Sequence, residues 1–224
     1  MFILKDILVG FISQIGATIF YVIDGLGKYT LFVQKIFAWV SKPPFRKKQI
    51  LEQIVFVGNQ SLFLIVLSSS FTGMVMAYQT YMGFKAISAD SFIGPVVAIS
   101  LAKELVPVIT GLIIAGRCGA AMAAQIGSMK VTEQIDALKV MGINPIQYLA
   151  VPRVIACSLV MPMLVIIFLV IGNFGSWLIG TKVLGIDSVI YFSKLSSIVK
   201  IEHVIEGLIK ASIFGFLIST IGTH

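Results

Sequence analysis

Residues 116–145 read GRCGAAMAAQIGSMKVTEQIDALKVMGINP, in which a run of small residues passes into a short charged segment and ends at Asn-Pro. The charged segment, 131–142, is far shorter than the roughly 20 apolar residues that a helix needs to cross a bilayer. A short amphipathic helix at the end of a long apolar stretch indicates a contact with something outside the membrane. The stretch therefore predicts a membrane helix that is followed by a short helix at the membrane surface.

Composition assigns the chain to the membrane. Of its 224 residues, 58% are hydrophobic and 12% are charged, and the mean hydropathy is +1.00. Soluble domains contain about 25% charged residues, roughly twice as many. The net charge of +7 is therefore better explained by Lys and Arg in cytoplasmic loops than by nucleic acid binding. The predicted fold class is an all-α polytopic membrane protein, with residues 1–224 as a single domain.

Residues 1–40 predict helices at the membrane surface. Apolar residues from Ile3 to Ile19 recur on one helical face, which is typical of a helix that lies in the interface. Glycines and charged residues between Asp24 and Lys28 interrupt this pattern, and the apolar stretch 29–40 is short for a full crossing. We expect an interfacial helix followed by an elbow that dips into one leaflet.

Four longer apolar stretches predict membrane spans. The segment 41–53 carries two prolines and four basic residues, and basic loops of membrane proteins lie in the cytoplasm. This places the N-terminus on the cytoplasmic side and orients the spans alternately outward and inward. The expected spans are 54–80, 92–127, 146–181 and 204–222, with 131–142 as a short cytoplasmic helix.

Lys103 and Glu104 lie well inside an otherwise apolar span. A lone charge near mid-membrane costs about 2.5–3.5 kcal/mol on insertion scales, so both side chains are expected to face protein or water. Two interpretations stay open: a structural ion pair, or a polar spot that lines a substrate cavity and meets a charged headgroup. Arg117 lies nearer the cytoplasmic end, where snorkelling or a contact with a backbone carbonyl is expected.

Met74, Tyr78 and Tyr81 lie toward the outer end of the first span. Tyrosines at a membrane interface commonly anchor a helix, and methionine adapts to irregular packing. Lining of the same substrate cavity is the other interpretation of these three residues.

Small residues at i, i+4 spacing form two neighbouring ridges over 111–128. Such ridges let helix backbones approach closely in lipid. They predict either ordinary packing within the chain or a moving or oligomeric contact. The candidates for helix packing or a dimer contact are Gly111, Ala115, Gly116, Gly119 and Ala120.

The short cytoplasmic helix carries its charges where the helix dipole favours them. Thr132 is expected to cap its N-terminus, with acidic residues in the first turns and Lys139 near the end. The helix is either a solvated connector or a surface that docks on a soluble partner. The candidate docking residues are Glu133, Gln134, Asp136, Ala137, Leu138 and Lys139.

Motifs for several chemistries are absent from the sequence. The segment GLGKYT at 25–30 is similar to the end of a P-loop, but Val22 stands where a P-loop requires glycine. The sequence contains no HExxH and no GxSxG, and Cys118 and Cys157 lie in apolar surroundings. We therefore expect no enzyme activity, no metal and no cofactor in this chain.

Three stretches closely resemble one family: FTGMVMAYQTYMGF at 71–84, 101–145, and YLAVPRVIA at 148–156. They are similar to the MlaE family of ABC transporter permeases, and the similarity extends over nearly the whole chain. The EQIDAL run with its flanking glycines is the most specific part. The resemblance implies a homodimeric permease that works with a cytoplasmic ATPase pair and moves phospholipids or related lipids between the inner and outer membranes of a Gram-negative-type envelope.

The resemblance also implies roles for residues and partners. Glu133 to Leu138 match the coupling helix that docks on the ATPase, and Lys103-Glu104 falls where the family usually has Arg-Glu beside a lipid cavity at the dimer interface. Tyr78 and Tyr81 would lie near that cavity. The implied partners are an ATP-binding subunit that hydrolyses ATP, a periplasmic MCE-domain protein and, in some systems, a STAS-domain protein.

The resemblance further implies an inner-membrane location. Family members continue past the position of Gly222 with a glycine-rich segment and a last membrane helix, which this sequence lacks. The alternative function is a membrane scaffold or regulatory subunit that anchors an ATPase complex without transporting lipid.

Overall fold

The computed structural model describes residues 2–43, 46–85 and 89–224, and every regular element in these ranges is a helix. Its internal contacts divide the chain into two units, Met1–Phe45 together with His224, and Arg46–Thr223. The second unit contains helices that are long and apolar enough to cross a membrane. The fold class expected from composition, an all-α polytopic membrane protein, is confirmed.

The first unit contains α1 (Phe2–Val40), which is one continuous helix. The interruption expected between Asp24 and Lys28 is therefore wrong. Lys28 forms an ion pair with Asp24, one helical turn away, and such i,i+4 pairs support a helix. A glycine inside a helix costs only about 1 kcal/mol relative to alanine, which a long helix tolerates. The apolar stripe expected from Ile3 to Ile19 falls largely on side chains outside the described residues.

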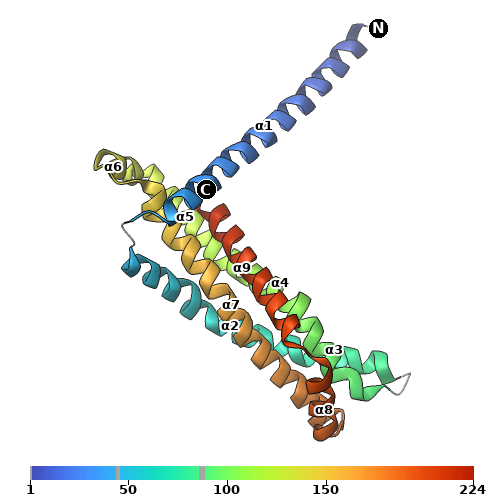
Figure 1. Ribbon diagram of the computed structural model, residues 1–224. Coiled ribbons are helices and arrows are strands. Elements are labelled where there is room, and N and C mark those ends of the chain that lie inside the picture. Colours follow the sequence, from blue (N-terminus) through green and yellow to red (C-terminus); the bar gives the residue numbers. More distant parts are fainter. Residues whose placement is uncertain (1, 44–45, 86–88) are drawn as a thin grey trace. The chain divides into compact units, whose positions relative to one another are not determined.

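The second unit is a bundle of long helices (Figure 1). Figure 1 shows α2, α7 and α9 running side by side, with the short helices α6 and α8 at opposite ends of the bundle. The helical stretches that could cross a membrane are Lys47–Lys85, Asp90–Val131, Ile146–Val183 and Ile201–Thr223. In chain order the elements are α2 (Lys47–Lys85), η1 (Asp90–Phe92), α3 (Ile93–Ser100), η2 (Leu101–Leu105), α4 (Val106–Ile114), η3 (Ala115–Gly119), α5 (Ala120–Val131), α6 (Gln134–Val140), η4 (Ile146–Ala150), α7 (Val151–Leu178), η5 (Ile179–Val183), α8 (Ser188–Ile198) and α9 (Ile201–Thr223).

Ridges at i, i+4 spacing hold the bundle together. Helices of this kind pack by setting the i±4 ridge of one into the groove of another. On both α2 and α9 the ridge that faces the bundle is built largely from small residues, whereas α9 turns a ridge of large apolar residues outward. The buried ridges are Val57, Ser61, Ile65, Ser69, Gly73 and Ala77 on α2, and Gly207, Ala211, Gly215, Ser219 and Thr223 on α9.

Glycines mark the places where the helix backbones touch. A Cβ atom at Gly73 would overlap the carbonyl oxygen of Gly172, so α2 and α7 meet backbone to backbone. A Cβ atom at Gly215 would lie 2.7 Å from the carbonyl oxygen of Cys157, so α9 and α7 also meet closely, although less tightly than α2 and α7 do. In lipid, association rests on such van der Waals contact because the surrounding tails are as apolar as the helices.

A buried tyrosine fastens α8 to the bundle. Asp187 caps α8 by accepting hydrogen bonds from the backbone N–H groups of Val189 (2.7 Å) and Ile190 (3.2 Å). One turn later, the Tyr191 hydroxyl lies 3.0 Å from Ser176 Oγ on α7. The pKa of the Tyr191 phenol is raised, because the effect of burial exceeds the opposing effect of the hydrogen bond with Ser176. The phenol is therefore neutral at physiological pH and acts as an anchor.

The backbone contact at Gly73 predicts opposite effects for two equal substitutions on α2. Gly73→Ala should lower the free energy of unfolding by about 1–3 kcal/mol, because the new methyl group meets backbone that cannot move aside. Gly83→Ala is the matched control: nothing lies within 4 Å of its Cβ position, and alanine favours the helix by roughly 0.5–1 kcal/mol. Thermal unfolding of both variants in detergent measures the difference, and equal midpoints would contradict the contact.

Candidate functional site

A proline creates the first element of the candidate site. The π-helical turn η2 precedes Pro107, and a proline has no N–H group to donate. The carbonyl of Lys103, four residues earlier, therefore loses its ordinary α-helical donor. A carbonyl inside a membrane span needs another partner, because no water replaces the missing bond.

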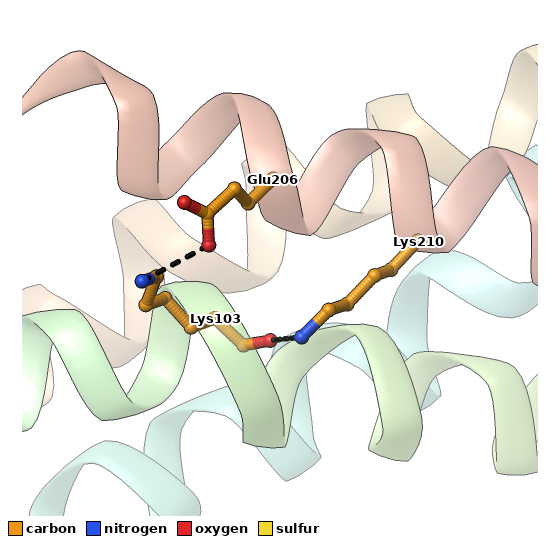
Figure 2. A network of polar contacts seen from close by, with 3 residues as sticks. All are labelled: Lys103, Glu206 and Lys210. Atoms are coloured by element: carbon orange, nitrogen blue, oxygen red, sulfur yellow. Dashed lines mark hydrogen bonds and ion pairs between the residues drawn. The ribbon is translucent and has the colours of Figure 1, made fainter.

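Lys210 of α9 supplies that partner. Its Nζ donates a hydrogen bond of 2.7 Å to the carbonyl oxygen of Lys103, which Figure 2 shows from close by. Gly207, one turn earlier on α9, makes this approach possible, because a Cβ there would overlap the carbonyl oxygen of Ala102. The amide backbone of η2 is thus held directly against α9.

The Lys103 side chain turns to the same helix. Its Nζ lies 3.0 Å from Glu206 Oε2, and Glu206 precedes Lys210 by one turn (Figure 2). The Lys103 side chain is 32% exposed and that of Glu206 is 49% exposed, so the pair lies at the bundle surface. We call these three residues the polar network. It places two ammonium groups against one carboxylate and therefore carries an excess of positive charge.

The polar network differs from one interpretation of the sequence, in which Lys103 forms an ion pair with its neighbour Glu104. Its ion pair is formed with Glu206 and not with Glu104, which is exposed. Within the described part of the chain, Glu104 forms no ion pair. The interpretation of Lys103-Glu104 as a self-satisfied pair is therefore wrong. Glu206 and Lys210 were missed, although charged residues at i, i+4 inside the span 204–222 were the same signal that drew attention to Lys103.

The three cavity candidates on α2 lie apart from these contacts. Met74 packs against α7, because a Cβ atom at Gly175 of α7 would lie 3.3 Å from Met74 Cγ. Tyr81 packs against the core, with Lys85 Nζ 5.5 Å from its ring centroid, and Tyr78 is about half exposed. Among the described residues, no hydrogen bond or ion pair joins any of them to Lys103.

The small residues predicted for packing divide into two groups. A Cβ atom at Gly111 would lie 3.6 Å from Phe214, and one at Gly119 would lie 3.3 Å from Ile218, so both glycines face α9. Nothing lies within 4 Å of the Cβ position of Gly116, and Ala120 is exposed. Ala115 is half-buried and belongs to neither group.

Arg117 ties η3 to α2. Its Nη atoms donate to the carbonyl oxygen of Phe56 (3.3 and 3.4 Å), to Ser61 Oγ (2.5 Å) and to Gln60 Oε1, and the guanidinium lies 5.3 Å from the Phe56 ring centroid. The carbonyl contact expected from the sequence is confirmed. These contacts with three residues of one helix make Arg117 a cross-link between two spans.

The second element of the site is α6 and the turn before it. Thr132 does not cap α6: its Oγ1 donates to the carbonyl of Ser128 (2.9 Å), and the residue ends α5. The expected N-cap is therefore wrong, because α5 runs as far as Val131 and the chain reverses at the next residues. Glu133 takes the left-handed conformation (φ 58°) and makes that reversal, which is uncommon for a residue other than glycine.

The docking candidates on α6 are mostly exposed. Leu138 alone among them turns inward and is 9% exposed, whereas Glu133, Gln134, Asp136, Ala137 and Lys139 are exposed. Lys139 Nζ lies 2.7 Å from Asp136 Oδ1, so these two charges are already paired. Val131, the last residue of α5, is 85% exposed, and Val140, the last residue of α6, is 89% exposed. A short helix with both charges and bare apolar side chains is typical of a docking surface.

Comparison with known proteins decides the family. Residues 50–224 match the family described as Permease MlaE. The chain belongs to this family. The resemblance seen in the sequence is thereby confirmed, and the protein is a multi-pass membrane protein.

Relatives with this architecture come from distant organisms. A probable ABC transporter permease protein of Rickettsia typhi is 43% identical over 201 residues, which cover 90% of this chain and 78% of the relative. The intermembrane phospholipid transport system permease protein MlaE of Haemophilus influenzae is 37% identical, over 96% of this chain and 82% of the relative. The chloroplastic protein TRIGALACTOSYLDIACYLGLYCEROL 1 of Arabidopsis thaliana is 37% identical, over 78% of this chain and 50% of the relative.

The polar network predicts that Pro107 and Lys210 are coupled. Lys210→Met should lower the free energy of unfolding by about 1–3 kcal/mol, because it leaves the Lys103 carbonyl without its donor. Pro107→Ala restores a backbone N–H, so the same Lys210→Met change should cost less in that background. A double-mutant cycle of thermal unfolding in detergent measures the difference. Equal losses in both backgrounds would show that Lys210 does not replace the donor missing at residue 107.

Proposed function

We propose that the chain is the permease subunit of an ABC transporter that moves phospholipids between the inner and outer membranes, driven by a separate cytoplasmic ATPase. The observation that carries the proposal is the 37% identity, over 96% of this chain, to a protein named as an intermembrane phospholipid transport permease. In this proposal ATP is hydrolysed in the partner chain, and the present chain carries the path for the lipid.

The polar network supports a role in holding the lipid headgroup. A phospholipid carries a phosphate, and the network offers two ammonium groups for one carboxylate at the bundle surface. The Lys103 side chain pairs with Glu206 but is about a third exposed. Its ammonium group can therefore leave the Glu206 carboxylate and bind a phosphate instead. We place Lys103 and Glu104, with Met74, Tyr78 and Tyr81, at the border of the lipid cavity.

The exposed surface of α6 supports a role as the coupling helix. A helix that transmits movement has to dock on its partner while remaining firmly joined to the membrane spans. The buried side chain of Leu138 supports this join, and the hydrogen bond from Ile143 N to its carbonyl (2.9 Å) closes the end of α6 on the turn that leads to η4. Glu133, Gln134, Asp136, Ala137 and Lys139 provide the outward surface. In this arrangement α6 and the N-terminus lie on the cytoplasmic side of the inner membrane.

The assembly proposed for the chain contains further copies and partners. Gly116 and Ala120 are open to the surroundings of the bundle, and small residues there would let a second copy approach closely. We propose a homodimer that binds an ATP-binding subunit and a periplasmic MCE-domain protein, with a STAS-domain protein in some systems.

Docking through α6 predicts that charge reversal there disrupts the complex. Glu133→Lys combined with Asp136→Lys should reduce co-purification of the ATP-binding subunit by at least about tenfold, because two complementary charges become repulsive. Glu202→Lys is the control, since this exposed glutamate begins α9 at the other end of the bundle. Undiminished association of the α6 variant would exclude α6 as the docking surface.

Headgroup binding at the polar network predicts a selective loss of transport. In vesicles that contain the reconstituted complex, Lys103→Glu should lower ATP-dependent phospholipid transfer by about tenfold or more, while the ATP-binding subunit stays bound. Lys182→Glu is the control, because this exposed lysine of η5 lies outside the polar network, and the variant should transfer lipid normally. A wild-type complex that assembles and hydrolyses ATP but transfers no lipid would instead indicate a membrane scaffold.

A further inference from the structure

A groove at the α8 end of the bundle lies beside the polar network, since Ala102 of η2 is part of its wall. It consists of two neighbouring cavities of about 410 and 350 Å³. Both are lined by Val170, Asn173 and Leu195, so they adjoin along this shared wall. The first extends toward Trp177 and the aromatic residues of α8, and the second extends toward α3 and the beginning of α9. None of the three residues of the polar network lines either cavity.

The groove is apolar except at one point. Its walls are aliphatic and aromatic, and α7, which forms its floor, is part of a stretch able to span a membrane. Asn173 is the exception. Its Nδ2 donates to the carbonyl of Leu169 (2.8 Å), but its Oδ1 is buried and has no hydrogen-bond partner. An unpaired acceptor in such surroundings costs free energy unless a ligand or a water supplies a donor.

Two lysines flank lining residues of the groove in the sequence. Lys194 and Lys200 are the direct sequence neighbours of the lining residues Leu195 and Val199. Lys194 Nζ lies 5.2 Å from the centroid of the Phe92 ring, which holds its charge between α8 and η1. In the part of the chain that the structure describes, neither lysine forms an ion pair with a carboxylate. The groove therefore joins an apolar channel to positive charge that has no anionic partner.

We propose that this groove binds a phospholipid, with an acyl chain along α7 and the phosphate at Lys194 and Lys200. The apolar walls match the chain, because methylenes that pack closely against them gain dispersion contacts. The lysines match the phosphate, as basic residues at a membrane surface attract anionic headgroups. Asn173 lies on the wall that the two cavities share, and the headgroup hydroxyl of a lipid such as phosphatidylglycerol can donate to its Oδ1. The site is a second lipid site, whose lining residues are distinct from the three residues of the polar network.

Photocrosslinking tests the proposal on the full chain without ATP or partners, so the result does not depend on transport. The purified protein is placed in phosphatidylcholine vesicles that contain a trace of phosphatidylglycerol with a diazirine in one acyl chain. Label is then mapped by mass spectrometry. We expect it on the peptides that contain Val170 to Trp177 and Tyr191 to Val199.

A matched pair of substitutions separates the groove from the general lipid-facing surface. Val170 is 65% exposed and Met163, two turns earlier on the same face of α7, is 61% exposed, but Met163 lines neither cavity. Val170→Trp fills part of the groove and should lower its labelling at least about threefold, because the acyl chain loses its close contacts with the walls. Met163→Trp should leave labelling unchanged. Circular dichroism verifies that both variants keep the wild-type helix content.

A second comparison tests the phosphate. Diazirine-labelled diacylglycerol has the same chains without the phosphate, and it should label the wild-type groove about tenfold less than phosphatidylglycerol does. Lys194→Gln combined with Lys200→Gln should remove this preference. Equal labelling of wild type and Val170→Trp, or crosslinks from the groove to a second polypeptide instead of lipid, would overturn the proposal. Equal labelling by the two lipids in the wild type would do so as well.

Discussion

Backbone contact between helices is the constraint on which the rest of this structure depends. In a bilayer the apolar surface of a helix gains nothing by leaving lipid for protein, so the spans hold together only where they fit closely. Gly73 against Gly172 and Gly215 against Cys157 provide such a fit for α2 and α9 on α7. Once these helices are fixed, the positions of the polar side chains between them follow.

The polar network illustrates this dependence. Lys210 reaches the Lys103 carbonyl only because Gly207 lets α9 lie directly on η2. The need for that bond arises from Pro107, which withholds a backbone donor inside a span. Lys210 thus supplies the hydrogen-bond donor that the Lys103 carbonyl lacks. It also brings a positive charge to the place where, in the proposed function, a lipid headgroup would pass. Structure and proposed function use the same contacts.

Hydropathy was sufficient to predict the fold class and the approximate spans, because long apolar stretches have few alternatives to a membrane helix. Local pattern was less reliable. Glycines and charges near Asp24 suggested a break, yet α1 continues, since an i,i+4 ion pair compensates for them. Thr132 suits an N-cap by its chemistry, but the end of α5 and the left-handed turn at Glu133 depend on how the two helices meet. A single sequence does not contain that information.

The sequence indicated one residue of the polar network. Lys103 was recognised because charge inside a span is unusual, and the partners on α9 carry the same signal. Their pairing across more than a hundred positions depends on tertiary contact, which spacing along the chain cannot reveal. Similarly, the small residues at 111–128 drew attention, whereas the buried ridges that pack most closely lie on α2 and α9. Small residues indicate that contact is feasible, and the structure shows where it occurs.

The π-helical turns have a consequence for how the chain tolerates insertion and deletion. Each such turn contains one residue more than an α-helix would place there, and it shifts every later residue around the helix axis by about 100°. Loss of one residue within Leu101–Leu105 would leave a continuous helix of nearly unchanged length and hydropathy. It would nevertheless turn the buried side of α4, with Val106 and Thr110, away from the bundle. A deletion that hydropathy cannot detect would thus misalign half of a membrane span.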